Sequence, residues 1–283
     1  MDKATEVNRA HFDSYWSSKV RLKSYLQYNA VYTRQLIDYG LRKALPERHH
    51  KRVLDIGFGI GEHFFLFPPT CALFGTEISQ RAIDLTLHEA KRRGYPQMHL
   101  RLSRSPTRLE FPDREFDVVI CSHVIEHLQD DLGMLSEVRR VLRPQGVAVF
   151  QIPLDLFDDK VHPDLELINP DFVIGKSDHV RRYNVHSFSN RLLSRGFEIL
   201  HQYSGGKPQD LMMILDTRIR QPLRRILPVA ERAISALLNI PLALLPFRLK
   251  HGLDQMLAPW GLHDHYGLWL ARSAVGLSFE AEL

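Results

Sequence analysis

The feature that most constrains the fold is a series of short apolar runs separated by helical or turn-rich stretches. Each run has the length of a strand and is rich in Val, Ile, Leu or Phe, without clean alternation of polar and apolar residues. That pattern is typical of parallel strands buried on both faces of a sheet. Their alternation with helices predicts a doubly wound α/β sheet built from βαβ units. The runs are Arg52–Ile56, Cys71–Ile78, Met98–Ser103, Phe116–Ser122 and Gly146–Pro153.

Helical periodicity marks the segments around these strands. Apolar residues recur at helical spacing from Lys19 to Leu45, before Pro46 ends the pattern. A second helix, with Leu128, Leu132, Leu135, Val138 and Leu142 on one face, is expected to stop at Pro144. Further along we expect a helix over Val185–Arg195, a strand over Gly196–Tyr203 and a last strand over His265–Ser273, whose alternation suits a solvent-facing edge.

The composition is that of a globular protein. The 283 residues exceed the usual size of one domain but suit one α/β domain with an insertion. With 44% hydrophobic and 25% charged residues, wholesale disorder is excluded. The two cysteines, Cys71 and Cys121, lie in apolar runs, so we expect buried thiols and a reducing, cytoplasmic setting. The N-terminal residues contain no apolar stretch of signal-peptide length, so they do not predict export.

Positive charge is concentrated near the C-terminal end. Between Lys207 and Trp260, eight Lys or Arg residues stand against four Asp or Glu residues, and this excess of four equals the formal net charge of the whole chain, +4. The run AISALLNIPLALLPF is shorter than the roughly 20 residues of a spanning helix, and Pro241 and Pro246 interrupt it. We expect an insertion that serves as a lid or a dimer interface. The alternative is peripheral contact of residues 218–250 with an anionic membrane.

These observations divide the chain into four parts. Residues 1–50 are expected to form an N-terminal helical cap and residues 51–206 a ligand-binding α/β core. Residues 207–262 form the basic, apolar helical insertion, and residues 263–283 supply the final strand and tail of the core.

A glycine-rich turn follows the first predicted strand, in the sequence VLDIGFGIGEHF. Its glycines, Gly57, Gly59 and Gly61, have the spacing G-x-G-x-G, whereas a dinucleotide fingerprint needs its third glycine at the position of Glu62. A negative side chain there would oppose a pyrophosphate, but not a nucleoside with a sulfonium. Glu77 ends the second strand, where a carboxylate can accept hydrogen bonds from both hydroxyls of a ribose. The alternative is a tight turn with a solvated strand end.

Five ordered segments carry a family resemblance: VLDIGFGIG, FGTEIS, LEFPDREFDVVICSHVIEHL, RRVLRPQGVAVFQIP, and DHVRRYN leading to GFEI. They resemble the class I S-adenosylmethionine-dependent methyltransferases, in particular the broad group that contains the ubiquinone and menaquinone biosynthesis type. The likeness covers about residues 52–203 and the terminal strand. It implies a Rossmann-like sheet of seven strands whose last strand inserts antiparallel. It also implies S-adenosylmethionine as cofactor and S-adenosylhomocysteine as product.

The resemblance assigns cofactor contacts to the carboxyl ends of the strands. Asp55 would hold the methionine amino group through a water or the loop backbone, Glu77 would bind the ribose hydroxyls, and Ile78 would pack on the adenine. Ser105 stands near the position at which many relatives carry an aspartate for the adenine amino group. The other cofactor residues would be Gly57, Phe58, Gly59 and Gly61 around the methionine and ribose, and Cys121 and Ser122 at the end of the fourth strand.

Methyl transfer from a sulfonium is an in-line displacement, so the protein mainly aligns the reacting groups and excludes water. A base is needed only for a hydroxyl or a protonated amine. Three histidines lie where a base could stand: His123 and His127, one helical turn apart, and His179. His123 and His127 are the catalytic candidates, although either could be structural.

The acceptor contacts expected from the resemblance lie elsewhere in the chain. His179, Arg181 and Tyr183 belong to a loop that commonly covers the acceptor pocket in relatives, and a helix N-terminal loop with solvated charge is the alternative. Tyr15, with Trp16, could fold over the cofactor or anchor the first helix on the core.

The sequence thus favours an enzyme that methylates an oxygen or nitrogen of a small-molecule, lipid-like or glycan acceptor. The competing hypothesis is a catalytically silent partner subunit that binds S-adenosylmethionine. Nicotinamide-dependent oxidoreduction is disfavoured by Glu62, and nucleic-acid methylation by the lack of an asparagine-proline-proline-aromatic motif. The pairs His49-His50 and His263-x-His265 lack the ligand spacing of known metal motifs, so no metal is expected.

Overall fold

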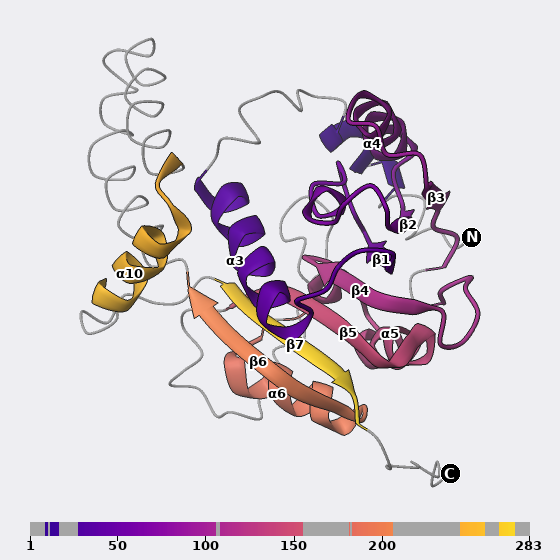
Figure 1. Ribbon diagram of the computed structural model, residues 1–283. Coiled ribbons are helices and arrows are strands. Elements are labelled where there is room, and N and C mark those ends of the chain that lie inside the picture. Colours follow the sequence, from indigo (N-terminus) through magenta and orange to yellow (C-terminus); the bar gives the residue numbers. More distant parts are fainter. Residues whose placement is uncertain are drawn as a thin grey trace, which may run out of the picture.

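The computed structural model describes residues 9–10, 12–16, 28–105, 108–154, 181, 183–205, 244–257 and 266–274. They contain a seven-stranded sheet in the order β3-β2-β1-β4-β5-β7-β6 (Figure 1). Every neighbouring pair is parallel except those of β7, which runs antiparallel to both β5 and β6. The predicted doubly wound sheet with an antiparallel last strand is therefore confirmed. The strands are β1 (Arg52–Ile56), β2 (Ala72–Glu77), β3 (Met98–Leu102), β4 (Phe116–Ser122), β5 (Leu142–Pro153), β6 (Phe197–Gly205) and β7 (Tyr266–Ser273).

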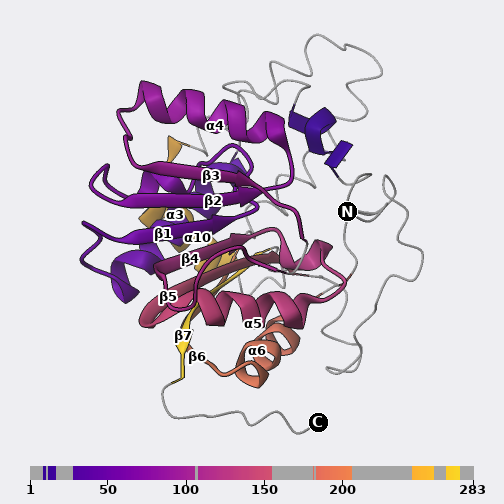
Figure 2. The ribbon, with the colours of Figure 1, turned by 90° about the vertical axis from the view of Figure 1, so that its right-hand side faces the viewer.

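Helices cover both faces of this sheet (Figures 1 and 2). On one face, α3 (Tyr28–Ala44) and α4 (Gln80–Arg92) contribute to a buried cluster with Val53, Val118 and Val149 of the strands. On the other face, α5 (Asp131–Val141) and α6 (Val185–Ser194) bury their apolar sides against Phe150 and Trp269. These two clusters form the core, one on each face of the sheet. Their packing fixes the position of the edge at which the parallel strands end.

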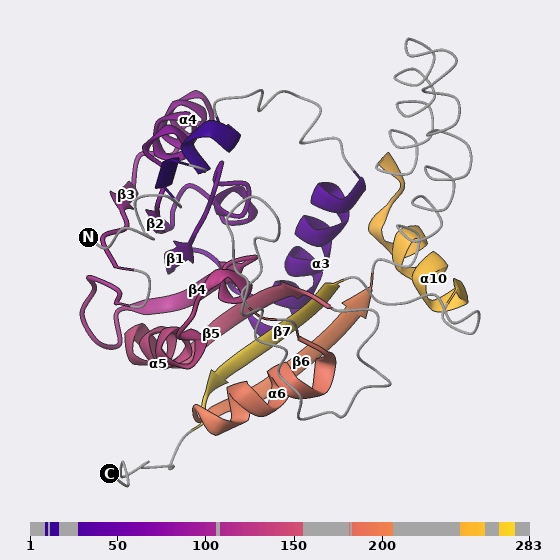
Figure 3. The same ribbon diagram turned by 180° about the vertical axis from the view of Figure 1, so that it is seen from behind.

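The basic insertion is represented by α10 (Phe247–Leu257), which lies beside α3 (Figures 1 and 3). Phe247 stacks on Tyr32 of α3 and contacts Tyr39. Most of the insertion, residues 206–243, lies outside the described residues. No helix in the described part of the chain combines the length and the apolar character needed to cross a bilayer.

Helix caps fix where the helices start at the carboxyl edge of the sheet. Ser79 caps α4 by accepting a hydrogen bond from the backbone N–H of Ala82, and Asp130 caps α5 in the same way through Gly133. Asn184 and Ser187 form a reciprocal capping box at the start of α6. The helix starts therefore follow from side chains that the local sequence supplies.

Two element boundaries differ from the sequence expectation. The helix expected to reach Pro144 ends at Val141, because Leu142 already pairs with Phe116 in the extended β5. The last strand is not a solvent-facing edge. It lies between β5 and β6, where helices cover both of its faces, and Leu268 and Trp269 are completely buried on opposite sides.

Candidate active site

The glycine turn after β1 adopts the left-handed backbone conformation three times, with φ of 62° at Gly57, 53° at Gly59 and 72° at Gly61. A Cβ at Gly57 would lie 2.4 Å from Val124, and one at Gly61 would lie 2.4 Å from Thr86. Glycine is therefore needed both for the backbone angles and for the close approach of neighbouring segments. This turn brings the end of β1 against the loop after β4.

The side chain of Phe58 points away from this turn into the core. It is buried, and its ring centroid lies 5.4 Å from that of Phe64. Only the backbone of Phe58 is therefore available to a ligand at the glycine turn. The contact of Phe58 with a cofactor stays a prediction. The geometry allows such a contact through the backbone of Phe58.

Glu77 closes the glycine turn from the end of β2. Its buried carboxylate accepts hydrogen bonds from the backbone N–H groups of Gly59, Ile78 and Ser79, at 2.8, 2.7 and 3.0 Å. Burial raises the pKa of Glu77, although these three hydrogen bonds partly oppose that effect. A carboxylate offers about four acceptor positions, so this one can still accept from a ligand hydroxyl.

Asp55, two residues before the turn, is buried and only half satisfied. Its Oδ2 lies 3.2 Å from Nδ1 of His63, whereas its Oδ1 has no hydrogen-bond partner among the described residues. Burial raises the pKa of Asp55, and the charge of His63 and its hydrogen bond act in the opposite direction. A buried acceptor without a partner is costly, so the site is suited to a cationic donor such as an ammonium group.

Glu62, next to the glycine turn, forms an ion pair with α3. Its carboxylate lies 3.3 Å from a guanidinium nitrogen of Arg34. Burial raises the pKa of Glu62, and the charge of Arg34 lowers it in turn. Glu62, whose negative charge argues against a bound pyrophosphate, is thus fixed to α3.

The described N-terminal residues, 9–10 and 12–16, lie against this edge of the sheet. Arg9 donates to the backbone oxygens of Ile78 and Ser103, and the carboxylate of Asp13 accepts from the hydroxyl of Ser79. A Cβ at Gly59 would lie 2.8 Å from the ring of Trp16, so Trp16 covers the glycine turn. Tyr15 is 61% exposed and meets Trp16 edge to face. Of the two rings that the sequence analysis named, Trp16 is the one that contacts the turn, and the contact expected of Tyr15 stays a prediction.

Two histidines lie on either side of a buried carboxylate at the end of β4. Nδ1 of His123 is 3.3 Å and Nε2 of His127 is 3.9 Å from Oε1 of Glu126. Burial alone would raise the pKa of Glu126, but the hydrogen bond and charge of His123 and the charge of His127 bring it below its usual range. His123 has a left-handed backbone, with φ of 55°, and precedes a short 3-10 helix, so the expected α-helical turn between the histidines is absent.

Ser122 and Cys121 end β4 on opposite faces. The hydroxyl of Ser122 donates to Oε1 of Gln151 on β5, at 2.9 Å. Cys121 is completely buried in the cluster that α5 and α6 cover, and burial raises the pKa of its thiol well above the usual value. Ser122 belongs to the same face as Asp55 because side chains alternate along neighbouring strands in register.

Two further residues of this edge escaped the sequence analysis. Gln151 is 1% exposed, and its Nε2 has no hydrogen-bond partner among the described residues. Tyr266 of β7 meets the ring of His123 edge to face, with centroids 5.5 Å apart. The one sequence signal for Gln151 was a polar residue inside an otherwise apolar strand. Tyr266 gave none, because its neighbours are known only once β7 is placed.

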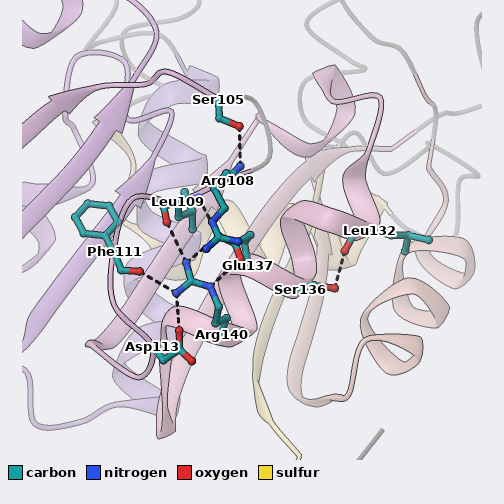
Figure 4. A network of polar contacts seen from close by, with 9 residues as sticks. All are labelled: Ser105, Arg108, Leu109, Phe111, Asp113, Leu132, Ser136, Glu137 and Arg140. Carbon is teal, nitrogen blue, oxygen red and sulfur yellow. Dashed lines mark hydrogen bonds and ion pairs between the residues drawn. The ribbon is translucent and has the colours of Figure 1, made fainter. Parts of the chain in front are cut away.

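Ser105 lies in a loop that α5 holds in place. Figure 4 shows Arg140 donating to the backbone oxygens of Leu109 and Phe111 and to the carboxylates of Glu137 and Asp113. The hydroxyl of Ser105 accepts from the backbone N–H of Arg108, at 3.0 Å. Arg140 thus anchors the described residues 109–113, and the Ser105 hydroxyl already bonds the backbone of Arg108. An adenine contact from this side chain stays a prediction.

Arg181 and Tyr183 converge on a buried aspartate. Arg181 lies 2.7 Å from one carboxylate oxygen of Asp131, and the hydroxyl of Tyr183 donates to the other at 2.7 Å. Arg191 of α6 also pairs with Asp131, at 2.9 Å. Burial and the charge of Asp131 raise the pKa of Tyr183. These groups join the start of α5 to α6, and the substrate contacts expected of Arg181 and Tyr183 stay predictions. His179 lies outside the described residues.

A family model described as a methyltransferase domain matches residues 27–202, which include the glycine turn, Glu77 and the histidine pair. The chain belongs to this family. The predicted family is confirmed, and with it S-adenosylmethionine as the cofactor of this class of domain. In this methyltransferase domain, the groups suited to hold the cofactor are the buried acceptor of Asp55, the carboxylate of Glu77 and the backbone of the glycine turn. Their individual contacts with the ammonium and the ribose stay predictions.

Curated relatives share part of the methyltransferase sequence. The human thiol S-methyltransferase TMT1B is 31% identical over 99 residues, which are 35% of this chain and 41% of the relative. The demethylmenaquinone methyltransferase of Deinococcus radiodurans is 29% identical over 118 residues, which are 39% of this chain and 48% of the relative. The chain thus spans less than half the length of these relatives.

A solved structure shows the same fold. Phosphoethanolamine N-methyltransferase 2 of Haemonchus contortus, in complex with S-adenosylmethionine, has a TM-score of 0.54 at 16% identity. The match covers 93% of this chain and 60% of that chain.

Proposed function

We propose that this domain transfers a methyl group from S-adenosylmethionine to an oxygen or nitrogen atom of a small-molecule acceptor, lipid-like or glycan. The observation that supports this most is the convergence of three features at one sheet edge. They are the unpaired buried oxygen of Asp55, the carboxylate of Glu77 over the glycine turn, and the His123–Glu126 pair.

The first two features serve the cofactor. S-adenosylmethionine carries its methyl group on a sulfonium. In an in-line displacement the sulfur is the leaving group, and a sulfonium is a good one. Asp55 would accept a hydrogen bond from its ammonium and Glu77 from its ribose, while the glycines allow the backbone to come close. Alignment of reacting groups in this way can contribute about 7 to 11 kcal/mol to a rate enhancement.

The histidine pair would serve the acceptor. His123 is 40% exposed at its side chain, so it can reach a ligand, and the buried carboxylate of Glu126 beside it would stabilise the imidazolium that forms when His123 takes a proton. This arrangement is chemically useful for an acceptor that loses a proton during transfer.

The fold by itself does not require this activity. The [4+2]-cyclase SpnF shares the fold, with a TM-score of 0.52 at 16% identity. A silent partner subunit that binds S-adenosylmethionine therefore remains the second candidate. The His123–Glu126 pair favours the enzyme, because a subunit that only binds the cofactor needs no such pair.

The lipid-like character of the acceptor is supported by two observations. Curated relatives include demethylmenaquinone and sterol 24-C-methyltransferases, whose names indicate apolar acceptors. The insertion adds apolar side chains near the sheet, of which Leu249 and Met256 of α10 are exposed. Within this proposal the insertion covers the acceptor or forms a dimer interface.

Calorimetric titration with S-adenosylhomocysteine tests the cofactor site. We expect Glu77→Gln to raise the dissociation constant about tenfold to hundredfold, because it removes the charge from a hydrogen-bond acceptor. The matched control is Glu89→Gln on α4, whose carboxylate pairs with Arg92 and Arg93 instead.

The outcomes separate the candidates. Folded protein that does not bind the cofactor product, or a Glu77→Gln variant that binds it normally, would contradict the proposed function. Binding without methyl transfer to any member of a panel of hydroxyl and amine acceptors would identify the silent partner subunit.

A further inference from the structure

Gln151 extends a row of side chains that faces α3. Along β5, Val147, Val149 and Gln151 alternate onto one face, and the first two belong to the cluster that α3 covers. On β4 the neighbouring position is Ser122, which follows Ile120 on the same face. Gln151 therefore lies where the apolar row of β5 ends and the carboxyl edge of the sheet begins.

The side-chain amide of Gln151 is oriented by Ser122, and the backbone of Gln151 is bonded to His123. Ser122 donates to Oε1 of Gln151, and the backbone oxygen of Gln151 accepts from the N–H of His123, at 2.8 Å. This leaves Nε2 as a buried donor without a partner among the described residues. Such groups are rare in folded proteins because an unmade hydrogen bond costs about 1 to 3 kcal/mol. An unmet donor beside a candidate base indicates a ligand group.

The neighbours define what that group can be. His123 adjoins Ser122 in the chain and meets Tyr266, which shares the face of Gln151 because it alternates with Leu268 and Leu270 along β7. Ile56 of β1 pairs with Cys121 of β4. The residues that follow them, Gly57 and Ser122, therefore lie at the same level of the sheet. The unpaired donor therefore lies one strand beyond Ser122, on the face and at the level of the glycine turn at which the cofactor would bind, and the candidate base follows Ser122 directly.

We propose that Nε2 of Gln151 donates a hydrogen bond to the nucleophilic atom of the acceptor, and that this atom is the oxygen of a hydroxyl or phenol. The proposal rests on the proposed function and narrows it from oxygen or nitrogen to oxygen. A hydroxyl oxygen has two lone pairs, one for the methyl carbon and one for Gln151. A neutral amine has a single lone pair, which it needs for the methyl carbon, and sulfur is a weak acceptor.

The step balances without another reagent. The acceptor oxygen forms its bond to the methyl carbon as the carbon–sulfur bond breaks, and the bonding electrons stay on sulfur. The hydroxyl proton passes to His123. The hydrogen bond from Gln151 strengthens as charge develops on the oxygen, which stabilises the ionised nucleophile.

Binding of two isosteric probes to protein saturated with S-adenosylhomocysteine tests this site. The probes are 4-nitrophenol and 4-nitroaniline, titrated by calorimetry and followed by the visible spectrum of the nitrophenolate. We expect 4-nitrophenol to bind at least about tenfold tighter than 4-nitroaniline. Gln151→Leu should weaken 4-nitrophenol binding about tenfold and change 4-nitroaniline binding little. Gln151→Glu, which keeps the shape, should weaken the nitrophenolate at least as much through charge repulsion.

The control is Gln202→Leu, the same change at an exposed position of β6. Tight binding of S-adenosylhomocysteine by each variant shows that it is folded and that its cofactor site is intact. If S-adenosylhomocysteine binds, three results would overturn the proposal. They are equal affinity for the two probes, no binding of either probe, and an unchanged preference for 4-nitrophenol in both Gln151 variants. Failure to bind S-adenosylhomocysteine at all would instead contradict the proposed function.

Discussion

At the scale of single residues, the site depends on keeping Asp55 ionised inside the protein. Desolvation raises the pKa of Asp55, and His63 opposes that rise by its charge and hydrogen bond. Burial would lower the pKa of His63, but the charge and hydrogen bond of Asp55, together with the charge of Glu62, outweigh burial and raise it, so Asp55 and His63 each favour the charged form of the other. Within the proposed function, His63 would be a positioning residue that acts on the cofactor through Asp55.

Replacement of His63 should make cofactor binding depend on pH. In His63→Asn the pKa of Asp55 rises further, so Asp55 becomes protonated as the pH falls and no longer attracts an ammonium group. We expect the affinity for S-adenosylhomocysteine to fall about tenfold at pH 6 and less at pH 8, as measured by calorimetry. His49→Asn, at an exposed histidine bonded to Thr70, is the control. Equal losses at the two pH values would show that His63 has only a structural role.

At the scale of elements, α10 attaches to α3 through a buried lysine. Nζ of Lys250 donates to Oε1 of Gln35, at 2.8 Å, and Lys250 is completely buried. Burial lowers its pKa from 10.5 to about 8, and the charge of nearby Arg34 contributes. The folded protein therefore binds this proton more weakly than the unfolded chain does, and the charged lysine destabilises the docked helix.

Removing the charge of Lys250 should therefore increase the free energy of unfolding by an amount that depends on pH. Below about pH 8 the full penalty is present, and it is relieved as the pH rises towards 10.5, the value for the unfolded chain. Lys250→Met should therefore raise the free energy of unfolding by about 1 to 2 kcal/mol more at pH 7 than at pH 10, measured by urea denaturation. Lys91→Met, at an exposed position of α4, should show no such difference. A pH-independent effect at Lys250 would rule out this account.

At the scale of the whole molecule, the net positive charge resides in the insertion rather than in the sheet domain. Between Lys207 and Trp260 the excess of four positive charges accounts for the whole formal net charge of +4. Arg224 and Arg225 stand in this segment, outside the described residues. Peripheral contact with an anionic membrane is the interpretation that makes a direct use of this charge.

Vesicle binding distinguishes that interpretation from a lid or dimer interface. If the insertion docks on membrane, binding to vesicles with 30% phosphatidylserine, roughly a physiological anionic content, weakens with salt. A double variant, Arg224→Glu with Arg225→Glu, should then lose about 2 kcal/mol or more, at about 1 kcal/mol per basic residue removed. Arg92→Glu on α4 is the control. Protein that ignores such vesicles at low salt leaves the lid or the interface as the role of the insertion.

The sequence by itself determined the sheet type, the glycine turn and the position of Glu77. Each of these depends on residues close together in the chain: a run of apolar residues predicts a buried strand, and a strand followed by spaced glycines predicts a tight turn. The same local information failed at Leu142, which continues the helical pattern of α5 but pairs with Phe116 in β5.

Only the tertiary structure decided which side chains meet. Ser122 meets Gln151 across 29 positions of the chain, and Tyr183 meets Asp131 across 52. The antiparallel insertion of β7 between β5 and β6 turned an expected edge into a buried strand and brought Tyr266 to His123. Such contacts depend on the order of strands in the sheet, which no local pattern specifies, because the free energy that fixes it comes from burying both faces at once.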